Sequence, residues 1–78
     1  MTQRLPRVTS TEIIKVLTSE GFVLARQSGS HKVYKNAAER RTTVPFHGHK
    51  ILHPKLLQSI CRDADISMER LKELLSKI

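Results

Sequence analysis

A histidine directly follows a glycine–serine pair near the middle of the chain. The pair Gly29-Ser30 separates two short runs of strand-forming residues, Phe22–Gln27 and His31–Asn36. A turn between two strands favours Gly and Ser, but it does not require a His at its exit. An imidazole with an ordinary pKa near ~6.5 can accept or donate a proton at neutral pH. The spacing therefore fits either a plain hairpin turn with a polar edge or an acid–base group held at a fixed strand position.

Positive charge is concentrated around this histidine. The 78-residue chain carries a formal net charge of +7, and between Arg26 and Lys55 the only acidic residue is Glu39. The basic residues of this span are Arg26, Lys32, Lys35, Arg40, Arg41, Lys50 and Lys55. They fall on predicted strands and loops, whereas a membrane-binding segment would place them along an amphipathic helix. This distribution favours a nucleic-acid partner over a membrane.

The length and the single cysteine limit what the chain can build. One domain over residues 1–78 is expected, with residues 1–8 as a loosely held lead-in. A chain of this size buries only roughly 60–65% of its unfolded surface, so a site should be a surface groove or an open sheet face. Cys61 has no partner for an internal disulfide, which fits a reducing cytoplasm, and its place in an apolar helical pattern predicts a buried thiol.

The pattern of apolar and turn residues predicts an α+β fold in the order α-β-β-β-α-α. A capping-box spacing at Thr9–Glu12 begins a helix over residues 10–20, which Gly21 ends. Three strands follow, Phe22–Gln27, His31–Asn36 and Arg41–Phe46, and Pro45 places the last one at a sheet edge.

Two helices complete the predicted fold. Pro54 suits the first turn of one, and Ser67 can cap the last, Met68–Ile78. The last helix has one apolar face, formed by Leu71, Leu74, Leu75 and Ile78. The helices should cover one face of a three-stranded antiparallel sheet and leave the other to solvent or ligand.

Several of these motifs together resemble the HicA family of bacterial and archaeal toxins. The resemblance runs from about Thr11 to Leu75. It is carried by Gly21-Phe22, Gly29-Ser30-His31, Val44-Pro45-x-His47 and Leu52-x-Pro54. It implies a fold like the double-stranded RNA-binding domain, cleavage of mRNA as the toxin of a toxin–antitoxin pair, and a HicB-like antitoxin as partner. It also implies that His31 is the catalytic residue. Lys55 stands where many members have Gly.

The resemblance and the charge lead to a mechanistic hypothesis, a metal-independent endoribonuclease. His31 would take the proton of a ribose 2′-OH or give one to the leaving 5′-oxygen. Arg26, Lys32 and Lys35 would hold the scissile phosphate.

Three further residues complete the expected substrate-binding set: Gly29, Ser30 and His47. Gly29 and Ser30 are also needed for the turn itself. His47 is also a candidate second acid or base, ranked below His31.

Other residues have simpler expected roles. Tyr34 should pack in the core, and Arg40 and Arg41 should form a solvated loop. The spacing His47-x-His49-x₃-His53 resembles a zinc site, but no carboxylate or Cys lies nearby to complete it, so no metal or cofactor is expected.

Two alternatives to catalysis remain open from the sequence. The basic face could serve a non-catalytic RNA-binding module, or it could exist to be covered by an acidic antitoxin. The second is compatible with the nuclease hypothesis, because an inhibitor that masks His31 would use the same surface.

Overall fold

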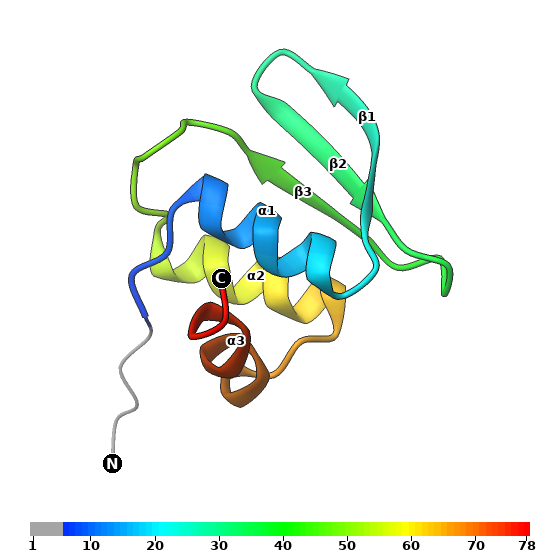
Figure 1. The fold of residues 1–78 in the computed structure, drawn as a ribbon. Coiled ribbons are helices and arrows are strands. Elements are labelled where there is room, and N and C mark those ends of the chain that lie inside the picture. Colours follow the sequence, from blue (N-terminus) through cyan, green and yellow to red (C-terminus); the bar gives the residue numbers. More distant parts are fainter. Residues whose placement is uncertain (1–5) are drawn as a thin grey trace.

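The structure, a computed structural model, describes residues 6–78. The elements are α1 (Ser10–Ser19), β1 (Val23–Ser28), β2 (His31–Lys35), β3 (Arg41–Pro45), α2 (Pro54–Ala64) and α3 (Met68–Leu75). The strands form one antiparallel sheet in the order β1-β2-β3, and the helices lie together on one side of it (Figure 1). The predicted α+β class and the predicted order of elements are confirmed. No helix of the described residues is long and apolar enough to cross a membrane.

The first helix begins at the predicted capping box. The Thr9 side chain accepts a hydrogen bond from the Glu12 amide (3.1 Å), and the Glu12 carboxylate accepts one from the Thr9 amide (2.9 Å). These reciprocal bonds satisfy two backbone donors that lack partners at a helix start. Local chemistry is therefore sufficient to fix where α1 begins.

The same helix ends in a Schellman motif that sets the start of the sheet. Gly21 takes the left-handed conformation (φ 89°), and the Phe22 amide donates to the Leu17 carbonyl (3.0 Å). Phe22 is 2% exposed, so its ring belongs to the core. Because its amide completes the helix end, the strand begins one residue later than predicted, at Val23.

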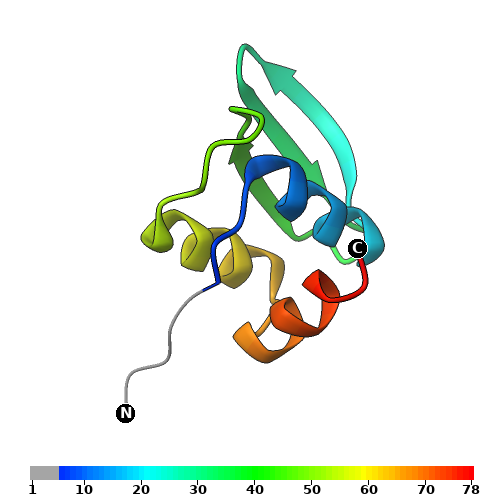
Figure 2. The same cartoon turned by 60° about the vertical axis from the view of Figure 1, so that its left-hand side comes forward.

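The helices pack mainly against one edge of the sheet. Both α1 and α2 contact β3, and α3 packs on α1. Figure 2 shows the β1–β2 hairpin extending beyond the helices, and every residue of β1 is exposed. The core therefore lies between β3 and the helices, with Tyr34 and Val44 supplied by the inner face of the sheet.

Two expectations about the ends of the chain require correction. Residues 1–8 were expected to be loosely held, but Val8 is fully buried and its carbonyl accepts a bond from the Leu52 amide (2.8 Å). Residues 1–5 lie outside the described part of the chain. Ile78 was expected on the packed face of the last helix, but α3 ends at Leu75 and Ile78 is 48% exposed.

The buried thiol of Cys61, 1% exposed as predicted, gives the fold a pH dependence. Burial raises the pKa of this thiol to about 11, because the thiolate loses its hydration in the core. An unfolded thiol titrates near ~8.5, so the stabilisation is complete below that pH and is lost as the pH rises through the folded pKa.

We expect the Cys61 term in the free energy of unfolding to fall by roughly 2–3 kcal/mol between about pH 8.5 and 11. Urea unfolding under reducing conditions, compared at each pH with Cys61→Ala, isolates this term from the titration of the lysines. Parallel pH profiles for the two proteins would contradict the assignment.

Candidate active site on the open face of the sheet

A two-residue loop fixes His31 at the start of β2. Gly29 and Ser30 join β1 to β2, and Ser28 pairs directly with His31 across the hairpin. Gly29 has a positive φ of 58°, and a Gly with positive φ at the first loop position is the pattern of a type II′ turn. The Ser30 carbonyl accepts a bond from the Phe46 amide (2.6 Å), which ties the loop to the end of β3. The predicted turn is confirmed.

The strand register decides which side chains share the face of His31. On β3, His31 pairs with Pro45, and residues that pair across strands lie on the same face. Every second residue along β2 then shares that face, and the intervening Tyr34 is buried toward the helices. The residues that pair with these positions on β1 and β3 lie on the same face. We call this surface the open face; it includes Arg26, His31, Val33, Lys35, Arg41, Thr43 and Pro45. It is the side that the helices leave uncovered.

A basic groove occupies the middle of the open face. It has a volume of about 320 Å³ and is lined by Ala25, Arg26, Val33, Lys35, Arg41 and Thr43. Along β2, Val33 lies two residues from His31 and Lys35 lies four residues from it. At the rise of a β-strand, these separations are about 7 Å and about 13 Å. Of the predicted substrate-binding residues, Arg26 and Lys35 thus share a face with His31.

Lys32 lies on the opposite face from His31. It pairs with the buried Val44 and is itself partly buried. Its Nζ sits 4.1 Å from the centroid of the Phe46 ring, a cation–π contact. Lys32 was grouped with Arg26 and Lys35 by sequence position, but strand alternation separates it from them.

The sequence reasoning overlooked Arg41. It was expected at the start of the strand Arg41–Phe46, which the structure confirms, but its side chain was grouped with that of Arg40 as solvated and without a role in the site. In β3 it pairs with Lys35 on the open face. Arg40 instead contacts the end of α2, with an ion pair to Asp65 (3.7 Å) and a bond to the Asp63 carbonyl (3.4 Å). The two-residue period of the predicted strand could have identified Arg41.

His47 lies in the loop after β3, two residues beyond Pro45. Its side chain is exposed, and its amide donates to the Ser10 hydroxyl (3.3 Å), which in turn donates to the Pro45 carbonyl (2.8 Å). Ser10 is fully buried, so this hydroxyl binds the end of β3 to the start of α1. The position of Pro45 beside His31 is therefore fixed from the core.

The remaining histidines are not gathered into a cluster. His53 caps α2, with its Nδ1 accepting a bond from the Lys55 amide (3.1 Å), and His49 is exposed in the loop. Within residues 6–78, no group of three or more His, Cys, Asp or Glu side chains is placed to hold a metal ion.

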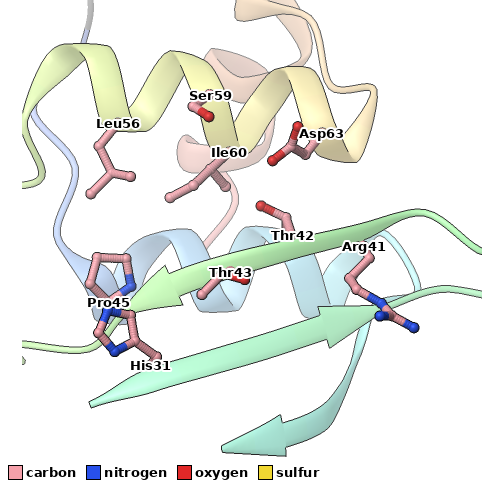
Figure 3. A pocket seen from close by; sticks show the side chains of 9 residues that line it. All are labelled: His31, Arg41, Thr42, Thr43, Pro45, Leu56, Ser59, Ile60 and Asp63. Atoms are coloured by element: carbon pink, nitrogen blue, oxygen red, sulfur yellow. The ribbon is translucent and has the colours of Figure 1, made fainter. Parts of the chain in front are cut away.

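A second groove runs between β3 and α2 and reaches His31 at one end (Figure 3). Its volume is about 440 Å³. Nine residues line it: His31, Arg41, Thr42, Thr43, Pro45, Leu56, Ser59, Ile60 and Asp63. It shares Arg41 and Thr43 with the basic groove. Ser59 and Asp63 were not identified from the sequence, because nothing local places a face of α2 beside β3.

The fold and the site define a small α+β domain with an exposed histidine on a basic sheet face. A family model described as "HicA toxin of bacterial toxin-antitoxin" matches residues 10–66, which is well over half of the chain. The chain therefore belongs to the HicA toxin family, as the motifs predicted. A sequence search of curated proteins gave no match.

The turn that holds His31 should be sensitive to substitution of Gly29. A Cβ at this position meets no atom within 4 Å, so the cost is backbone strain alone. We expect Gly29→Ala to lower the free energy of unfolding by about 1–2 kcal/mol. Urea unfolding of Gly29→Ala is compared with that of Ser30→Ala, at which position φ is not positive. Equal losses in the free energy of unfolding for the two variants would show that the turn does not require a glycine at position 29.

Proposed function

We propose that this HicA family chain acts as the toxin of a type II toxin–antitoxin system by cleaving mRNA, with His31 as a general acid–base group and without a metal ion. The observation that carries the proposal is the position of His31. An exposed imidazole stands at a braced strand start, on a helix-free face that also presents Arg26, Lys35 and Arg41. A polyanion can approach this face without displacing any part of the core.

The reaction removes a proton from the attacking ribose 2′-oxygen and delivers a proton to the leaving 5′-oxygen. His31 accepts the proton of the ribose 2′-OH, and the 2′-oxygen attacks the phosphorus. The bond to the 5′-oxygen breaks, and the imidazolium returns a proton to that oxygen. The products are a 2′,3′-cyclic phosphate and a 5′-hydroxyl.

The open-face cations support the charge change in this reaction. Negative charge develops on the phosphate oxygens as the 2′-oxygen attacks, and fixed positive charges nearby lower its cost. Lys35 forms only a weak pair with Glu39 (3.9 Å), whose side chain is 84% exposed. An exposed pair of this kind contributes about 0–1 kcal/mol, so a phosphate can readily replace the carboxylate.

The same surface suits an antitoxin partner. A HicB-like antitoxin that covers the open face with acidic groups would both neutralise Arg26, Lys35 and Arg41 and block His31. A non-catalytic RNA-binding module is the alternative function, and cleavage assays separate the two.

Replacement of His31 should abolish toxicity without unfolding the protein. His31 is exposed, and such substitutions usually change stability by less than about 0.5 kcal/mol. Loss of a general acid–base group should slow cleavage about 10²–10⁴-fold. Growth after induction and cleavage of RNA in EDTA, each compared between wild type and His31→Ala, measure the two effects.

The assay has an internal control for the attacking group. An RNA with a single 2′-deoxy substitution at the cleaved position should bind but remain intact. Equal cleavage by wild type and His31→Ala would refute the mechanism. RNA that is shifted in a gel but never cut would establish the binding-module alternative.

The two faces of the sheet should differ in their effect on RNA affinity. Each phosphate contact to single-stranded RNA contributes about 0.7 to the slope of log K against log salt. We expect the double variant Arg26→Ala, Lys35→Ala to reduce that slope by about 1.4. Lys32→Ala, which removes one positive charge on the helix side, should leave it unchanged, whereas Lys35→Ala alone should reduce it by about 0.7. Fluorescence anisotropy of a labelled RNA at several salt concentrations measures the slopes, and a similar loss with Lys32→Ala would contradict the assignment of the RNA to the open face.

A further inference from the structure

We propose that the groove between β3 and α2 binds the base of a nucleotide next to the phosphate that faces His31, and that Asp63 selects a base with an exocyclic amino group. The inference rests on the proposed function, because it assigns part of the same substrate. Such a base is cytosine, adenine or guanine, as opposed to uracil.

The lining of the groove suits a flat, uncharged group with hydrogen-bond donors. Leu56 and Ile60 on α2 and Pro45 on β3 provide apolar walls, and Ser59 and Asp63 add a hydroxyl and a carboxylate (Figure 3). Ser59 and Asp63 are four residues apart, so they share one face of the helix. The volume of about 440 Å³ lies within the range of pockets that hold small organic ligands.

The carboxylate of Asp63 distinguishes this groove from the basic one. Within the described residues, Asp63 forms no ion pair, although its backbone carbonyl accepts a bond from Arg40. A free carboxylate repels a phosphate but accepts a hydrogen bond from an amino group, as acidic residues do from cytosine N4. Phosphates therefore belong on the cations of the open face, and the base belongs in the groove.

Thr42 provides a second, independent indication that something binds here. Its side chain is 2% exposed and points from β3 toward α2, and its Oγ1 is a buried polar atom with no hydrogen-bond partner within residues 6–78 (Figure 3). A buried hydroxyl left unpaired lowers stability, so such groups are rare without a role. A polar group in the groove, held directly or through a water molecule, would satisfy it.

The two grooves meet along β3, which gives the RNA a continuous path. Arg41 and Thr43 line both grooves, and His31 stands at one end of the groove between β3 and α2. A ribose seated over the edge of β3 would place its base against α2 and its phosphate on the open face. His31 would then lie within reach of the sugar–phosphate link.

The test measures base preference in binding, so that it does not depend on cleavage. The His31→Ala protein is titrated into fluorescein-labelled ten-nucleotide RNAs of cytidine or uridine alone, and the ratio of the two dissociation constants is recorded. We expect a preference for cytidine of about fivefold or more, the value of one amino–carboxylate contact. Adding Asp63→Asn should bring the ratio close to one, because an amide can also donate to uracil O4.

Asp65→Asn in the same background is the matched control. Asp65 lies two residues further along, pairs with Arg40 and has a left-handed conformation that Asn tolerates. It should leave the cytidine preference unchanged. Thermal unfolding verifies that each variant is folded.

The outcomes separate this inference from the proposed function. The assignment of the groove would be overturned if the His31→Ala protein showed no cytidine preference. It would also be overturned if the preference persisted after Asp63→Asn was added. The nuclease proposal would stand in either case if wild type cleaves RNA and His31→Ala does not. A base preference that depends on Asp63 would conversely support the groove even if no cleavage were found.

Discussion

The register between β2 and β3 is the constraint on which both the core and the candidate site depend. Val44 is fully buried against the helices, and Thr42 lies on the same side. Because side chains alternate along a strand, their neighbours must face outward. A slip of one residue would bury Arg41 and Thr43 and expose Val44, so the hydrophobic core selects the register. The same selection sets Pro45 opposite His31. The chemistry of the open face is thus fixed by packing on the other side of the sheet.

Local signals in the sequence predicted most of the fold. The capping box at Thr9, the glycine at the end of α1 and Pro54 at the start of α2 each act within one turn of chain, so they can be identified without tertiary information. The incorrect predictions concern residues whose environment depends on contacts with distant parts of the chain. Val8 is buried because its backbone pairs with Leu52, more than forty residues away. Nothing near Val8 in the sequence indicates that contact.

The candidate site was also predicted only in part, because local features were identified and features that depend on packing were not. The tight turn was predicted from the Gly29-Ser30 pair between two strand-forming runs. Arg26 and Lys35 were assigned to the site by their charge and sequence position, and the strand register places both on the face of His31. Lys32 was misgrouped because adjacent residues were treated as neighbours in space, whereas its ammonium group lies over Phe46 on the helix side. Asp63 could not be found at all, since its position beside β3 depends on how α2 crosses the sheet. Identifying a groove between two elements requires their packing, and no periodicity within either one supplies it.

The isolation of β1 has a consequence for how the molecule moves. This strand is exposed along its whole length, its main partner is β2, and its pairing with β2 is interrupted between Leu24 and Arg26. Elements with few buried contacts open locally at low free-energy cost, while buried strands open only with global unfolding. Amide hydrogens of β1 would therefore exchange with solvent far sooner than those that β2 and β3 share. His31 lies on the protected side of this boundary. Fraying of β1 would move Arg26 and the edge of the basic groove, while the imidazole of His31 keeps its position beside Pro45.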